Sequence, residues 1–171
     1  MLTLRTRPKF DLMKLNMTLP LLTLICGALS LLAAETDTLW IEGETPSRGQ
    51  NYPHPWYSDQ VQKGALSGGG WLSSFTDKAD TEVAYDIDVP KEGNWSLWAR
   101  LNPTQSKASW KLNNGAWTAI DMDQATDRIN IASDGKPDLR YVAWVNLGKL
   151  PLKAGKTTLA FKLHSDSSVT S

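Results

Sequence analysis

Apolar and polar residues alternate along the chain from Leu39 onward with a period of two. The clearest run is residues 82–89, where Val83, Tyr85, Ile87 and Val89 alternate with acids and one alanine. Such a period places successive side chains on opposite faces of a β-strand. A Pro- and Gly-containing turn at residues 90–94 leads into a second alternating run at residues 95–101. This pattern predicts a β-hairpin.

Further short runs of the same kind predict strands at residues 39–44, 71–75, 109–112, 116–120, 140–147 and 157–163. The Asn-Gly pair at residues 114–115 predicts a second hairpin. We expect about eight strands and almost no helix. Evenly spaced short strands with Gly and Pro turns indicate an all-β fold, an antiparallel β-sandwich of the jelly-roll type. Its predicted interior includes Val83, Tyr85, Ile87, Leu97, Leu159 and Phe161.

Two predicted connections are long. Residues 46–62 carry Tyr52, Trp56 and Tyr57 among the prolines Pro53 and Pro55, and residues 121–139 are polar and rich in aspartate. Long loops on a rigid sheet are frequent positions of binding residues.

The first 34 residues have a different pattern. An uncharged apolar run at residues 17–34 follows four basic residues and one acid. This arrangement predicts a secretory signal peptide at residues 1–34, with Met13 as an alternative start and an uncleaved membrane anchor as the competing interpretation. Residues 35–171 then form one domain that is secreted, periplasmic or at the cell surface, with no membrane partner after cleavage.

The remaining chemistry does not favour catalysis. Cleavage removes the single cysteine, Cys26, and changes the formal net charge from zero to about −3, which argues against a nucleic-acid partner. The two histidines, His54 and His164, lack the spacing of a zinc site. Asp86 and Asp88 share one strand face, where a glycosidase pair is possible but solvated surface acids fit better. We therefore predict a non-enzymatic domain.

Tryptophan is unusually frequent, with eight residues in the chain. An indole offers a flat apolar face and a polar N–H, and it needs a hydrogen-bond partner when it is buried. Trp40, Trp95 and Trp144 fall at strand positions that we assign to the core.

Other aromatic residues are candidates for ligand binding. Trp56 and Tyr57, with Tyr52 nearby, lie in a proline-stiffened polar loop where burial is least expected. Trp98 and Arg100 share the face of their strand that points away from the predicted core. They either line a surface under a ligand or stack together as a cation–π pair.

The order of several motifs resembles a known family. Residues 39–44, LWIEGE, resemble the opening motif of carbohydrate-binding modules of families 6 and 35, in the galactose-binding-like superfamily. Residues 89–100, VPKEGNWSLWAR, are similar to their central hairpin, with Trp95 in the aromatic place. Residues 144–148 and 152–159 are similar to their late strand pair, with Thr157 where histidine is usual.

The resemblance implies a jelly roll that binds a polysaccharide or oligosaccharide through aromatic residues in loops at one edge. It also implies a structural calcium ion held in part by Glu42 and Glu44. Relatives close with an aspartate-containing strand that pairs back to the opening strand. Residues 164–171 are polar, and Asp166 is a poor substitute, so we expect the last strand to be missing.

Together these features predict a secreted, non-catalytic carbohydrate-binding module that is the N-terminal accessory domain of a polysaccharide-degrading enzyme. The catalytic domain would follow in the same protein. The alternative is a structural or adhesive β-sandwich that binds protein partners and uses its tryptophans as core.

Overall fold

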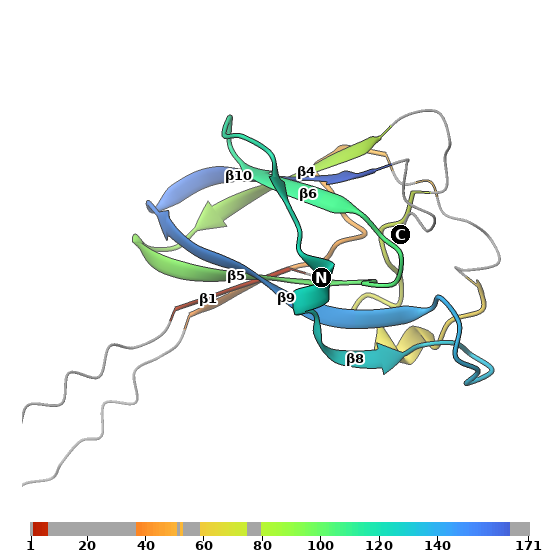
Figure 1. The fold of residues 1–171 in the computed structure, drawn as a ribbon. Helices are drawn as coiled ribbons and strands as arrows, with labels where there is room; N and C mark the ends of the chain where they lie inside the picture. Colours follow the sequence, from red (N-terminus) through yellow and green to blue (C-terminus); the bar gives the residue numbers. More distant parts are fainter. Residues whose placement is uncertain (1, 7–36, 51, 53–58, 75–79, 165–171) are drawn as a thin grey trace, which may run out of the picture.

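The computed structural model describes residues 2–6, 37–50, 52, 59–74 and 80–164. In this part of the chain, ten strands form two five-stranded antiparallel sheets that pack face to face (Figure 1). Sheet A has the order β2-β1-β5-β9-β8, and sheet B has the order β3-β4-β10-β6-β7. The predicted all-β sandwich is confirmed.

The strands of sheet A are β1 (Leu2–Thr6), β2 (Thr38–Ile41), β5 (Gly93–Leu101), β8 (Thr126–Asn130) and β9 (Tyr141–Leu152). Those of sheet B are β3 (Arg48–Gly49), β4 (Thr81–Val89), β6 (Ala108–Leu112), β7 (Thr118–Ala119) and β10 (Gly155–Leu163). Two short 3-10 helices, η1 (Lys63–Ala65) and η2 (Met122–Gln124), lie in connections. No helix in the described part of the chain is long and apolar enough to cross a membrane.

The predicted hairpin at residues 82–101 is wrong. Strand β4 belongs to sheet B and pairs with β10, whereas β5 belongs to sheet A and pairs with β1 and β9. The turn between them therefore carries the chain from one sheet to the other. Alternation reveals that each strand has one apolar face, but it does not reveal whether the two faces lie side by side or opposite each other. The Asn-Gly hairpin between β6 and β7 is confirmed by the pairing of Ser109 with Ala119.

Two further predictions need correction. The expected strand at residues 71–75 is reduced, in its described part, to a single bridge between Ser74 and Tyr52. Ser73 and Ser74 are both buried there. The expected polar loop at residues 121–139 contains β8. This edge strand has exposed side chains on both faces for most of its length, so its sequence shows no alternation.

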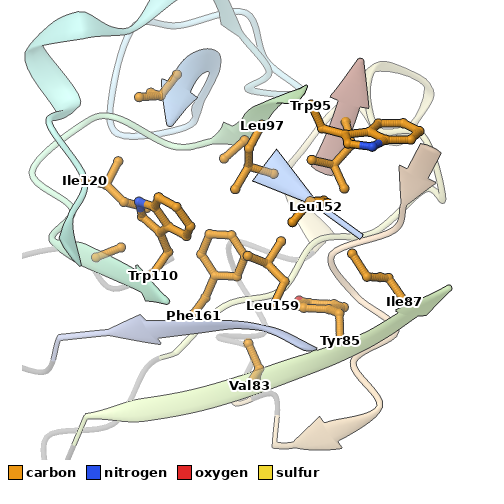
Figure 2. Close-up of a cluster of buried hydrophobic side chains, with 14 of the residues drawn as sticks. Val83, Tyr85, Ile87, Trp95, Leu97, Trp110, Ile120, Leu152, Leu159 and Phe161 are labelled. Atoms are coloured by element: carbon orange, nitrogen blue, oxygen red, sulfur yellow. The ribbon is translucent and has the colours of Figure 1, made fainter. Parts of the chain in front are cut away.

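The hydrophobic core lies between the two sheets (Figure 2). All six residues predicted to lie inside are buried, and Trp95 and Leu97 are 0% exposed. Tyr85 and Phe161, from neighbouring strands of sheet B, meet edge to face with ring centroids 6.2 Å apart. In a smaller cluster, Val61 and Leu66, which flank η1, pack with Ile131 and Val142.

Strand β1 has an unexpected origin, because Leu2–Thr6 lies inside the predicted signal peptide. It occupies the position between β2 and β5, and its Leu4 is 1% exposed in the main core. The family resemblance implies that a closing strand pairs with the opening strand β2. In this structure the strand that pairs with β2 is β1. The rest of the predicted signal peptide, and Asp166, fall outside the described residues.

Candidate functional site

Three tryptophans lie on the outer face of sheet A. In β5, Trp98 alternates with the buried Leu97 and Ala99, so its side chain points away from the core. Thr3 of β1 is paired with Trp40 of β2 on one side and with Trp98 on the other. Directly paired residues of adjacent strands project from the same face of a sheet. Trp40 therefore shares the outer face with Trp98.

The third tryptophan joins them from β9. Trp144 is paired with Arg100, which is on the same face of β5 as Trp98, and it lies between the buried Ala143 and Val145. The rings of Trp40 and Trp144 are 6.3 Å apart between centroids and are tilted by 58°. We call the surface formed by Trp40, Trp98 and Trp144 the tryptophan face.

The assignment of Trp40 and Trp144 to the core is therefore wrong, whereas that of Trp95 is confirmed. Trp40 is 53% exposed and Trp144 is half-buried. Each lies in a run of consecutive apolar residues, Leu39 to Ile41 and Val142 to Val145, so the sequence does not show which alternate residues point inward. The pairing register supplies the missing information.

Trp98 is half-buried and faces outward, as expected. Arg100 uses its guanidinium to donate a hydrogen bond of 3.0 Å to the Ala65 carbonyl oxygen at the end of η1. The cation–π contacts among the described residues are made by other side chains, Lys111, Lys162 and Arg128. Arg100 thus anchors the η1 connection, and Trp98 remains the ligand candidate of this pair.

Tyr52, another predicted sugar-binding residue, is not brought onto the tryptophan face. Tyr52 is 40% exposed and follows β3 of sheet B; its N–H donates to the Ser73 carbonyl at 3.0 Å and its hydroxyl to Gln50 at 2.9 Å. Trp56 and Tyr57 lie outside the described residues.

Glu42 and Glu44 lie in the turn directly after β2. The Glu42 carboxylate accepts a hydrogen bond of 2.5 Å from the Ser67 hydroxyl. The Glu44 carboxylate approaches Gly68 so closely that a Cβ there would lie 1.7 Å from its Oε1. Both glutamates therefore reach the same loop. The Tyr85 hydroxyl holds the turn by donating to the Gly43 carbonyl at 2.6 Å; burial raises the pKa of Tyr85, and the Glu44 charge adds to the rise.

These two glutamates supply only part of a calcium site. Calcium takes six to eight oxygen ligands, usually several of them carboxylates. In the described ranges no group of three or more His, Cys, Asp or Glu residues is arranged to hold a metal ion. Among the described residues no third side chain of these types joins the two glutamates, and calcium binding stays a prediction.

The outer face of sheet B carries charge in place of exposed indole. Arg48 donates two hydrogen bonds to Asp86, one of them 2.9 Å long from Nη2 to Oδ1, and Thr158 donates a third at 2.8 Å. These hydrogen bonds hold the pKa of Asp86 below its usual value, and the largest contribution comes from Arg48. Lys162 pairs with Glu82 at 2.8 Å.

Trp117 also belongs to this side of the molecule. The ammonium groups of Lys111 and Lys162 lie 4.4 and 4.7 Å from its ring centroid. Its ring is therefore already in contact with cations of the domain itself.

In comparisons with known proteins, no family model and no curated protein matches the chain.

Proposed function

We propose that this chain is a non-catalytic carbohydrate-binding domain whose ligand, a polysaccharide or oligosaccharide, stacks on the tryptophan face. The observation that carries the proposal is the exposure of Trp40, at 53%, beside the half-buried Trp144. Leaving an indole in water is unfavourable, and a ligand that covers it recovers that free energy. A pyranose ring has an apolar C–H face that fits a flat aromatic surface, and hydroxyl groups that remain in water.

The shape of the surface limits the affinity. A sheet face is shallow, and binding must offset lost translational and side-chain freedom. Aromatic contacts of this kind are worth on the order of 0.5–1.5 kcal/mol each beyond area burial. We therefore expect weak binding to single sugars and stronger retention by polymers that cover more than one ring.

The proposal changes the predicted position of the site and keeps the predicted ligand. Sequence reasoning favoured the loop with Trp56 and Tyr57, and those residues remain candidates for a second contact. Export of the domain, with a catalytic domain further along the same protein, also remains part of the proposal. It is supported by the signal-peptide pattern at residues 1–34 and by the family resemblance. Cleavage after residue 34 would remove Leu2–Thr6 together with the signal peptide, so the experiments below use the uncleaved chain, in which β1 is present.

Affinity electrophoresis of the full chain in gels that contain single polysaccharides tests the site. With a retarding polysaccharide, Trp40→Ala should weaken retention about tenfold or more, since it removes the most exposed ring. Trp117→Ala is the matched control: it removes the same kind of side chain from the other side of the sandwich, next to β7, and should leave retention unchanged.

The Trp56→Ala variant separates the two positions. If only Trp56→Ala abolishes retention, the site lies at the loop and the proposal for sheet A fails. If no polysaccharide retards the parent chain, the adhesive sandwich becomes the better interpretation.

Calcium is the second proposal and has an independent test. An ion that binds only the native state raises the melting temperature by mass action. EDTA should therefore lower the melting temperature of the parent chain, and excess calcium should restore it. A Glu42→Gln, Glu44→Gln double variant should not respond. An identical melting curve for the parent chain with and without EDTA would show that these glutamates hold no structural ion.

A further inference from the structure

In the described part of the chain, β1 is the strand that connects β2 to the rest of sheet A. Its residues pair antiparallel with β2, from Leu2 opposite Ile41 to Arg5 opposite Thr38. They also pair antiparallel with β5, from Leu2 opposite Ala99 to Thr6 opposite Trp95. The edge strand β2 therefore keeps its place in sheet A through β1.

Strand β1 is held by its main chain and by one buried side chain. Backbone hydrogen bonds on both sides provide pairing that does not depend on side chains, and Leu4 provides one apolar anchor in the core. Strand addition of this type gives affinity through the main chain and specificity through alternate side chains. The strand is only five residues long, and 31 residues separate Thr6 from Thr38.

We propose that the space between β2 and β5 is a strand-binding groove, and that Leu2–Thr6 is an exchangeable ligand of this groove. The groove accepts an extended segment that runs antiparallel to both neighbours and places an apolar side chain at the position of Leu4. The covalent connection keeps β1 in the groove by raising its effective concentration, as a linker does in any tethered complex. Cutting that connection therefore makes the strand exchangeable.

Occupancy of the groove also affects the tryptophan face. Trp40 is on β2, and Trp144 is on β9, on the other side of the groove. Loss of β1 removes the ladder that keeps β2 in sheet A and separates Trp40 from its partner. This consequence for sugar binding rests on the proposed function, whereas the groove itself does not.

The experiment uses the full chain with a protease recognition sequence inserted after Asp11. The probe is a fluorescein-labelled peptide of residues 1–8, MLTLRTRP, and binding is followed by fluorescence anisotropy. After cleavage the chain should bind the peptide. The uncut chain should bind it at least tenfold more weakly, because its own strand competes. The same peptide with Leu4→Asp should bind the cut chain at least tenfold more weakly than the parent peptide.

A second variant covers the case in which cleavage unfolds the domain. The uncut chain with Leu4→Ala keeps its connection but holds its own strand less firmly, so it should take up more peptide than the uncut parent. Two results would overturn the proposal. One is that the Leu4→Asp peptide binds the cut chain as tightly as the parent peptide does, and the other is that the parent peptide binds neither the cut chain nor the Leu4→Ala chain. No sugar enters these measurements, so their outcome is independent of whether the tryptophan face binds carbohydrate.

Discussion

The outer faces of the two sheets arise from the same alternation of residues but present different chemistry. On sheet B the polar groups satisfy one another: Arg48 and Thr158 bind Asp86, and Lys162 pairs with Glu82. On sheet A, Trp40 is 53% exposed, and its ring meets that of Trp144.

Two tryptophans, one on each side of the molecule, illustrate the difference between the two outer faces. Trp117 and Trp40 are the same residue type on opposite sides of the sandwich. The ring of Trp117 lies near two lysine ammonium groups, and these contacts use the negative face of the ring that a ligand would need. A position at the surface is therefore not enough to leave an indole available to a ligand, because the neighbouring side chains decide whether its ring is already covered.

The largest expected effect tests the distinction between core and surface within sheet A. Trp95 is 0% exposed, so Trp95→Ala should cost about 3–5 kcal/mol in the free energy of unfolding. Trp40→Ala should cost within about 1 kcal/mol, as surface substitutions usually do. Urea denaturation of both variants measures the difference. Equal losses would mean that Trp40 is part of the core and that the tryptophan face is not a free surface.

The sequence predicted the core well because β4, β5 and β10 each have a clear apolar face, and Val83, Tyr85 and Phe161 lie where alternation puts them. It did not predict strand partners. A turn such as residues 90–92 is compatible with a hairpin and with a crossing between sheets, and only packing decides which forms.

The candidate site was harder to predict for a related reason. Trp40 and Trp144 lie in strands with apolar residues at both alternate positions, so the orientation of each side chain depends on the register with β1 and β5. The role of Leu2–Thr6 was hidden for a different reason: Leu2 and Leu4 alternate with Thr3 and Arg5, but the segment lies in the basic flank ahead of an apolar run and was therefore assigned to a leader.

A smaller effect concerns the contact within the tryptophan face. Aromatic pairs contribute about 0.5–1.5 kcal/mol beyond their buried area, and the centroid distance of 6.3 Å between Trp40 and Trp144 lies within the favourable range. A double-mutant cycle with Trp40→Ala and Trp144→Ala, followed by urea denaturation, should give a coupling energy of this size. The cycle of Trp40→Ala with Trp117→Ala, on opposite sides of the sandwich, should be additive. Additivity in both cycles would contradict the contact.

The smallest effect concerns the ion pair that distinguishes sheet B. Asp86 has a lowered pKa in the folded state because Arg48, and next Thr158, donate hydrogen bonds to its carboxylate. A lowered folded-state pKa gives stabilisation that is present above the unfolded pKa, about 3.9 for aspartate, and is lost as the pH falls through the folded-state pKa. Both partners are exposed, so this contribution is small and is screened by salt.

Replacing Arg48 tests this account in two ways. Arg48→Met should raise the pKa of Asp86 toward its ordinary value, measured by NMR titration, and Thr158→Val should raise it less, because its bond is the weaker cause. The melting temperatures of parent and Arg48→Met should differ slightly at pH 7 and converge as the pH falls through the pKa of Asp86. An unchanged Asp86 pKa in Arg48→Met would mean that this pair does not persist in solution. Its carboxylate would then be free to bind a ligand on sheet B, and the contrast between the two faces would weaken.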